Sequence, residues 1–495
     1  MRVVILGGVR WCCIFLLLVA ACGSKTDKRA PAPSADPTAP VVPALPGESA
    51  AKPDFPAGTR SLELVRTVAV RLEPGDDAKR VGTLAIDTRV GFKGTATGKG
   101  CTKPWVELEP RGWICSDHVQ PSTKPALGRE VPALDRGTIV PGDYGRITGP
   151  NATTYTFARP DKKQAKDKDK KKSGPVTSPS EVDAKPEAGK LIEYKPILGT
   201  LTVRIYEELT VDGKQYLRID PKQKELVLAS QVRRLTPSGY MGARLGDDTG
   251  WVLPFGFIWP RSKWQQAWTY AQPNRVQYRQ IAARTPVPIL ETFKGKDGKP
   301  SAYRIGPAEW VGAADVRVFP AMAPPKYLRP AERWIDIDLD SQILVAFEGE
   351  MPIYATLISS GLKDTATTPG LYRVWLKESE ADMKNLKAED PYSVATVPWT
   401  QFFYSEEDLA LHTAYWHDNF GQQRSHGCVN LAPRDARWLY YWSDPQVPPG
   451  WTMTTGVVES PGSVVRVRST AVPEPEWKGY AKKVVEARQA NAPLQ

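Results

Sequence analysis

The chain has 495 residues, and its 66 lysines and arginines against 55 acidic residues give a formal charge of +11. A chain of this length corresponds to about three domains, and a content of 41% apolar residues excludes a wholly disordered protein. Reactive side chains are scarce: there are six cysteines and four histidines, and three of these histidines lie between His412 and His426. Candidate chemistry is therefore concentrated in one short segment.

Residues 1–21 are predicted to be a secretory signal. Arg2 and Arg10 lie in a segment without acidic residues, and the apolar stretch that follows, residues 11–20, is too short to cross a bilayer as a helix. The segment Val-Ala-Ala-Cys-Gly at 19–23 resembles the lipobox of bacterial lipoproteins, in which the cysteine, here Cys22, carries lipid after cleavage. The alternative is an ordinary cleavage site with an incidental cysteine. We expect a bacterial envelope protein with an N-terminal lipid anchor that faces the periplasm, and Gly23 favours the outer membrane by analogy with enteric sorting.

Residues 22–57 are predicted to be a lipidated tether. Eight prolines lie between residues 24 and 57, among alanines, serines and charged residues. This composition cannot form a packed core and favours extended polyproline II structure. At about 3.1 Å per residue the segment could reach roughly 100 Å, which would hold a domain away from a membrane.

Three related modules are predicted next, with boundaries at 58–122, 135–240 and 281–320 and an aromatic-rich connector at 241–280. Each module contains two short strands joined by a turn, then a polar cap and a valine, and these valines are Val119, Val232 and Val316. The pattern resembles bacterial SH3-type (SH3b) domains. The resemblance implies tandem small β-barrels.

Cys101 and Cys115 both lie in the first module. In an oxidising envelope we expect the two cysteines to form a disulfide. It would close a loop of about 15 residues and stabilise the fold by about 3 kcal/mol. The alternative is a pair of free buried thiols.

A lysine-rich insertion at 160–190 interrupts the second module. Residues 161–172 hold seven lysines and three aspartates, and the Pro/Ser/Glu-rich remainder is also typical of disorder. The alternative is a contact with an anionic polymer. Once this segment and the signal are set aside, no basic stripe interleaved with aromatic residues remains, so we expect no nucleic-acid partner.

The last domain begins with strict alternation of apolar and acidic residues. Ile335, Ile337 and Leu339 alternate with aspartates, which predicts a hairpin with one solvated face and a second strand at 343–347. Further along, residues 411–431 contain one cysteine and three histidines. A cysteine near histidines is typical of a nucleophile, because a thiol needs a base or a cation to become a thiolate.

The segment Ser425-His426-Gly427-Cys428-Val429-Asn430, with His412 fourteen residues before His426, resembles the signature of YkuD-type L,D-transpeptidases. The resemblance covers residues 332–468, and a tail at 469–495 with a short helical pattern follows. It implies a β-sandwich catalytic domain, so the expected fold class is mainly β, with tandem SH3-like barrels before that domain. Thr413 departs from the glycine that many members have after the first histidine.

The resemblance also implies roles for these residues and peptidoglycan stem peptides as partners. Cys428 would attack the carbonyl of the third stem residue, and His412 would act as base while a backbone carbonyl, that of Thr413, holds its ring. The N–H groups of His426, Gly427 and Cys428 would form the oxyanion hole, and Ser425 would orient the loop. Candidate substrate contacts are Arg424, Asn430 and Arg434, with solvated surface cations as the alternative for the arginines. No cofactor and no metal are implied.

Several alternatives stay open. The product is a 3→3 cross-link if an amine accepts the acyl group, but water as acceptor would make the protein an L,D-carboxypeptidase. The three histidines and Cys428 could ligate zinc, although the chain has no HExxH motif. His417 and Trp416 are more often packing residues.

Two further alternatives concern the class of protein. Residues 360–363 match the S-x-x-K motif of penicillin-binding proteins, but neither S-D-N nor K-T-G accompanies it. The chain could also bind the cell wall without catalysis, through its barrels and the aromatic stretch at 251–268.

Overall fold

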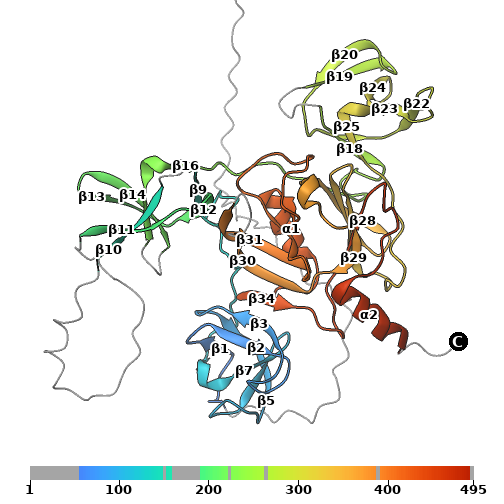
Figure 1. Ribbon diagram of the computed structural model, residues 1–495. Coiled ribbons are helices and arrows are strands. Elements are labelled where there is room, and N and C mark those ends of the chain that lie inside the picture. The colour runs from blue at the N-terminus through green and yellow to red at the C-terminus, as the bar shows by residue number, and fades with distance from the viewer. Residues whose placement is uncertain are drawn as a thin grey trace, which may run out of the picture. The chain divides into compact units, whose positions relative to one another are not determined.

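The computed structural model describes residues 55–148, 152–158, 190–220, 225–260, 266–385 and 391–490 (Figure 1). The predicted signal, the lipidation site Cys22, nearly all of the tether and nearly all of the lysine-rich insertion lie outside the described residues. Ala50–Gln495 form one compact unit. The protein is mainly β, as expected, with 47% strand and 9% helix.

Each of the three modules contains a three-stranded and a five-stranded antiparallel sheet. In the first module the sheet orders are β4 (Arg89–Val90), β1 (Ser61–Leu64), β8 (Val119–Ser122) and β3 (Arg80–Leu84), β2 (Val68–Arg71), β7 (Trp113–Cys115), β6 (Trp105–Leu108), β5 (Phe92–Ala96). In the second they are β16 (Val232–Arg234), β9 (Asp143–Ile147), β12 (Thr200–Ile205) and β11 (Leu191–Pro196), β10 (Thr153–Phe157), β15 (Glu225–Leu228), β14 (Lys214–Asp220), β13 (Glu207–Val211). In the third they are β21 (Pro286–Pro288), β18 (Phe255–Ile258), β25 (Val316–Phe319) and β20 (Arg275–Ile281), β19 (Ala267–Gln272), β24 (Glu309–Gly312), β23 (Pro300–Gly306), β22 (Glu291–Lys294).

The repeated sequence feature is a single structural unit. In each copy a β-hairpin leads into a short 3-10 turn, and the turns are Ser116–His118, Ala229–Gln231 and Ala313–Asp315. The valine after each turn begins the next strand, which is β8, β16 or β25. The modules are pairs of open sheets, and none of the sheets among the described strands closes into a barrel.

The third module begins earlier than the repeat alone predicts. The predicted connector at 241–280 contributes β18, β19 and β20 to this module, and its strand β17 (Ala243–Arg244) pairs with the last domain. Phe255 and Phe257 of β18 pack on Phe319 of β25. The boundary is therefore set by pairing between distant segments, which a search for local repeats does not detect.

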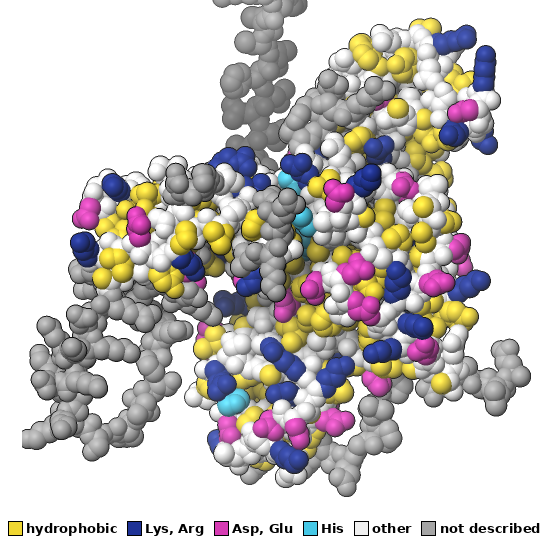
Figure 2. Space-filling view, in the orientation of Figure 1, with side chains coloured by type: hydrophobic (Ala, Val, Ile, Leu, Met, Phe, Trp, Pro, Cys, Tyr) yellow, Lys and Arg dark blue, Asp and Glu magenta, His cyan; other side chains and the backbone are white. Residues whose placement is uncertain are grey.

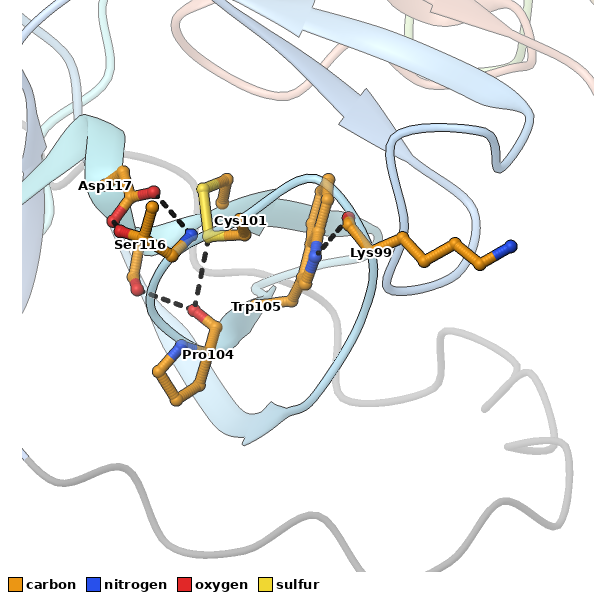
Figure 3. The surroundings of a disulfide bond; sticks show 8 residues. Lys99, Cys101, Pro104, Trp105, Ser116 and Asp117 are labelled. Carbon is orange, nitrogen blue, oxygen red and sulfur yellow. Dashed lines mark hydrogen bonds between the residues drawn. A yellow bond between two sulfur atoms is a disulfide. The ribbon is translucent and has the colours of Figure 1, made fainter.

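A disulfide joins Cys101 and Cys115 in the first module. Cys115 ends β7, and Cys101 lies in the loop that precedes β6. The carboxylate of Asp117, in the turn after β7, accepts hydrogen bonds from the N–H and the hydroxyl of Thr102 (Figure 3). The loop is thus attached to β7 by a covalent bond and to the turn by two hydrogen bonds.

The last domain is built from two sheets. One has the order β17, β28 (Met351–Leu357), β27 (Ile343–Glu348), β26 (Arg333–Asp338), β35 (Val464–Arg468), β29 (Gly370–Arg373). The other contains β34 (Trp451–Thr455), β30 (Leu376–Asn385), β31 (Tyr392–Tyr404), β32 (Leu409–Thr413) and β33 (Val429–Leu431). Both sheets and helix α1 (Pro433–Trp442) contribute to one apolar core (Figure 1).

The β26–β27 hairpin has no solvated face, so that expectation was wrong. Asp336 is only 2% exposed, and Arg466 and Arg468 of the neighbouring strand β35 pair with its carboxylate at 2.6 and 2.9 Å. Trp334, on the same face, packs in a core that also contains Phe319 of the third module. This acidic face can be buried because Arg466 and Arg468, which are far from it in the sequence, neutralise its charge.

Two modules extend the second sheet of the last domain. β3 of the first module pairs antiparallel with β34, and β12 of the second module pairs parallel with β31. The result is a single 13-stranded sheet. Gly199 has a φ of +66°, and a Cβ there would lie 1.9 Å from the carbonyl oxygen of Pro391, so only glycine permits this close approach.

The predicted tail at 469–495 belongs to the last domain. It forms helix α2 (Gly479–Ala490), which buries Val484 and Val485 and pairs Arg488 with Glu332 at 2.9 Å. Neither of the described helices combines the length and the apolar character needed to cross a membrane.

Candidate active site

His412 lies on strand β32, and Cys428 lies directly before the neighbouring strand β33. The two strands are parallel, with Leu411 beside Val429 and His412 beside Asn430. Leu411 and Val429 are both fully buried in the domain core. Since side chains alternate along a strand, His412 and Asn430 point to the opposite face. The sulfur of Cys428 accepts a hydrogen bond from the backbone of Ala410, two residues before His412, so the thiol lies beside the strand that carries the imidazole.

The ring of His412 is held in one tautomer. Its Nδ1 lies 2.9 Å from the carbonyl oxygen of Thr413, the contact expected from the sequence. A carbonyl oxygen can only accept, so Nδ1 carries the proton and Nε2 is left as a base. Burial lowers the pKa of His412 to about 4, although the hydrogen bond to Thr413 opposes this shift. His412 is therefore neutral near pH 7.

Cys428 is the free cysteine of the described residues. Its surface is partly open, yet protein surrounds the sulfur closely enough that burial raises the pKa of the thiol to about 11. The backbone of Ala410 donates to the sulfur and opposes this shift, while the thiol lies 3.6 Å from the carbonyl oxygen of Asp408. Thiol and imidazole are thus both neutral at rest.

The loop at 425–428 is ordered from within by Ser425. The Ser425 hydroxyl donates to the carbonyl of Cys428 and accepts the N–H of Gly427 at 3.2 Å. The N–H of Gly427 is thus used inside the loop when no substrate is bound, and its donation to an oxyanion stays a prediction. The N–H groups of His426 and Cys428 form no hydrogen bond within the described residues, so they remain as candidate donors.

A buried threonine attaches this loop to the segment at 359–367. The hydroxyl of Thr367 donates to the carbonyl of Gly427 at 2.6 Å and accepts the N–H of Gly361 at 3.0 Å. Thr367 is 1% exposed. Gly427 has a φ of +126°, and a Cβ there would approach Leu409 to 3.2 Å, so a side chain would strain the loop.

The S-x-x-K match at Ser360 has a structural role. Ser360 is 1% exposed, and its hydroxyl accepts a hydrogen bond from the amide of Gln342 at 2.6 Å. Its carbonyl accepts the N–H groups of Arg424 and Ser425. A buried and fully engaged hydroxyl is no nucleophile, so the resemblance to penicillin-binding proteins is excluded at this position.

His417 and Asn430 form a hydrogen-bonded pair close to His412 and Cys428 in the sequence. Nδ1 of His417 accepts the N–H of Asn419 at 3.1 Å, and Nε2 lies 2.9 Å from the amide of Asn430. A neutral imidazole that accepts at Nδ1 carries its proton on Nε2, so Nε2 donates and the amide presents its oxygen. Asn430 is 2% exposed and is engaged with His417, and its contact with substrate stays a prediction. Within the described residues, the three histidines and Cys428 do not assemble into a metal-ligand cluster.

Tyr392 is a residue of the site that the sequence did not indicate. Its ring stacks on the exposed ring of His426, with centroids 4.5 Å apart. Burial raises the pKa of Tyr392, and the nearby charge of a Cys428 thiolate raises it further. No local sequence motif identifies Tyr392, because its position beside the loop depends on how β31 pairs with strands from other parts of the chain. Trp416 lies beside His412 at 5.8 Å between centroids.

The two candidate arginines differ in position. Arg424 is exposed, lies four residues before Cys428, and its charge adds to the burial that lowers the pKa of His417 to about 3. Arg434 is exposed on the first turn of α1 and forms no ion pair within the described residues. Arg424 is therefore the cation closer to the site.

Comparisons with known proteins agree with this geometry. Residues 332–467 match the family model of the YkuD L,D-transpeptidase catalytic domain. The chain is 30% identical over 121 residues to YciB of Bacillus subtilis (strain 168), a protein with a provisional name as an L,D-transpeptidase, and the match spans 59% of that protein and 22% of this chain.

Similar solved structures include an L,D-transpeptidase from Mycobacterium smegmatis, with 18% identity, 37% of this chain and 90% of that chain covered and a TM-score of 0.23. The catalytic domain of an Enterococcus faecium L,D-transpeptidase has 23% identity, 28% and 98% coverage and a TM-score of 0.22. The family model and the curated relative support a YkuD-type L,D-transpeptidase catalytic domain in residues 332–467.

Proposed function

We propose that this protein is a peptidoglycan L,D-transpeptidase with Cys428 as its nucleophile. The observation that carries the proposal is the position of the Cys428 thiol beside β32, the strand that carries His412, with Nδ1 of His412 bound by the carbonyl of Thr413. This arrangement leaves a base beside a thiol, which is what nucleophilic acyl transfer requires.

In the first step the sulfur of Cys428 attacks the carbonyl carbon of the third residue of a stem peptide. A C–S bond forms while the thiol proton passes to Nε2 of His412, and the N–H groups of His426 and Cys428 donate to the oxyanion. The C–N bond to the terminal D-alanine then breaks, and His412 returns the proton to the leaving amine. The product is a thioester on Cys428.

In the second step an acceptor amine attacks the thioester and forms a 3→3 peptide cross-link. If water is the acceptor, the same site is an L,D-carboxypeptidase. Because the pKa of the thiol is about 11 and that of His412 about 4, little thiolate exists at rest. Proton transfer therefore accompanies the attack on bound substrate.

The remainder of the chain would place this domain in the cell envelope. We assign Cys22 to lipidation, the proline-rich segment to a tether, and the periplasmic face of the outer membrane to the location of the protein. The three repeated modules, which resemble SH3b domains in sequence, would bind cell-wall components. Support comes from the signal sequence and from the common hairpin, turn and valine of the modules.

The test is to incubate the purified full chain with a disaccharide tetrapeptide and to follow acyl-enzyme, D-alanine and dimer by mass spectrometry. Cys428→Ala should release no D-alanine, and His412→Asn should be slower by about 10²–10⁴-fold. Arg244→Gln, which removes an exposed cation of β17 that forms no ion pair within the described residues, is the matched control.

Equal activity of the wild type and Cys428→Ala would refute the proposal and favour a wall-binding protein without catalysis. Release of D-alanine without dimer would identify a carboxypeptidase. Inhibition by EDTA but not by a thiol alkylator would favour zinc chemistry instead.

A further inference from the structure

Two arginines face each other in the three-stranded sheet of the second module. Arg233 on β16 is the direct partner of Arg146 on β9. Like charges directly opposite one another destabilise an antiparallel pair. Arg146 reaches the hydroxyl of Thr202 at 3.4 Å, and neither arginine forms an ion pair within the described residues. The sheet therefore holds two adjacent positive charges, and no carboxylate of the described residues pairs with either of them.

The face that carries these arginines is turned toward the catalytic domain. Ile147 of β9 packs in the core of the second module, so Tyr144 and Arg146 point to the other face of the strand. The ring of Tyr144 stacks on Tyr415 at 3.8 Å between centroids. Tyr415 comes three residues after His412.

The same contact region borders the walls of the active site. Tyr144 and Tyr415 belong to an apolar cluster with Tyr392 and Trp416 at its edge. Of these two edge residues, Tyr392 stacks on His426 and Trp416 lies beside His412. Histidine side chains reach the surface here, with lysine and arginine side chains beside them (Figure 2).

Electrostatic effects agree with this placement. After burial, the largest cause, the charges of Arg233 and Arg424 lower the pKa of Arg146. The charges of Arg424 and Arg146 likewise add to the burial that lowers the pKa of His417. Arg146 and Arg233 are adjacent in the sheet, and the charge of Arg424 acts on both Arg146 and His417; these three arginines are called the cationic cluster.

Three carboxylates act on Tyr415 or His417, and each of them is already engaged; Asp382 accepts the N–H of Thr396 at 2.9 Å. Asp418 pairs with Arg284 at 2.7 Å, and Glu380 pairs with Arg204 at 2.8 Å. An external anion is the group that would balance the cationic cluster. Guanidinium groups match the planar carboxylate with paired hydrogen bonds, so a carboxylate is the favoured ligand.

We propose that Arg146, Arg233 and Arg424 bind a free carboxylate of the peptide whose carbonyl reaches Cys428. The second module is then part of the substrate site. The inference rests on the proposed function for the identity of the peptide. It adds that this peptide must carry a negative charge where it meets the three arginines.

Binding is measured by isothermal titration calorimetry on the full chain with Cys428→Ala, which prevents turnover. The titrants are a disaccharide tetrapeptide with free side-chain and backbone carboxylates and the same compound with those groups amidated. Arg146→Gln and Arg233→Gln should each raise the Kd of the free acid by about tenfold, as expected for loss of a hydrogen bond to a charged group. The amidated compound should bind equally weakly to all variants.

The matched control is Arg234→Gln. Arg234 is the next residue of β16 and has the same charge, but it points to the other face and pairs with Glu208. Its replacement should leave the Kd unchanged. If circular dichroism shows that an arginine variant does not fold, the test is the salt dependence of peptide binding to the protein that keeps all three arginines. The Kd of the free acid should rise with salt concentration, and the Kd of the amidated compound should not.

Equal affinity for the free and amidated compounds, or equal affinity of the arginine variants and the control, would overturn the inference. Absence of peptide binding would overturn it too. Binding that depends on the arginines, without any acyl-enzyme on the wild type, would leave the carboxylate site intact and refute the proposed function.

Discussion

The hydroxyl of Thr367 is the contact whose removal should most selectively disturb the catalytic loop. Thr367→Val preserves the shape of the side chain, so it leaves no cavity. It removes the donor to the carbonyl of Gly427 and the acceptor for the N–H of Gly361. Both backbone groups would then be buried without a partner.

The size of the effect follows from these two groups. Each buried polar group left without a partner costs about 1–3 kcal/mol, so the variant should lose about 2–6 kcal/mol in total. The two hydrogen bonds join only the loop and the segment at 359–367. The free energy lost in Thr367→Val should therefore appear first as disorder of the loop. Since 1.4 kcal/mol is a factor of ten, we expect the rate of acylation to fall by at least about tenfold.

The assay is the rate of acyl-enzyme formation, followed by intact-protein mass spectrometry, together with urea unfolding. Thr365→Val is the matched control: Thr365 is exposed and donates to the carbonyl of Ser425 at 3.3 Å, which also accepts the N–H of Leu362. This control should cost less than about 1 kcal/mol. Wild-type acylation by Thr367→Val would refute the reasoning, and equal losses in both variants would show that burial of the hydroxyl is not the cause.

Three further predictions concern the thiols and histidines of the protein. Cys428 should be alkylated slowly by iodoacetamide near neutral pH and faster toward pH 11, because its pKa is about 11 and only the thiolate reacts; a rate that levels off below pH 8 would contradict this. The folded pKa of His412, about 4, lies below its ordinary value of 6.5, so its contribution to stability is complete above pH 6.5 and is lost as the pH falls toward 4. Between pH 6.5 and 4, the free energy of unfolding measured in urea should therefore fall by about 3 kcal/mol less in His412→Gln than in the wild type. Parallel plots of this free energy against pH for the two proteins would refute the assignment. Serine at both Cys101 and Cys115 should lower the stability of the first module by about 3 kcal/mol without slowing acylation, and unchanged unfolding would contradict the role of the disulfide.

The architecture was predictable where its elements are local. The hairpin, turn and valine of each module recur in sequence because they are formed by neighbouring residues, and they recur in the structure. The boundary of the third module was missed because β18 pairs with β21 and β25, which come much later in the chain. The buried state of Asp336 was missed for the same reason, since its partners Arg466 and Arg468 lie on another strand.

The sequence by itself determined the chemistry of the candidate site. Ser425, Gly427 and Cys428 lie within four consecutive residues, and His412 precedes them by a short spacer, so covalent geometry restricts how these groups can meet. Only the tertiary structure decided which neighbours complete the site. The use of the Gly427 N–H by Ser425, the approach of Tyr392 and the direction of Arg146 all depend on how loops fold and strands pair. A shift of one residue in a strand register would turn such side chains to the opposite face, and local sequence does not encode that choice.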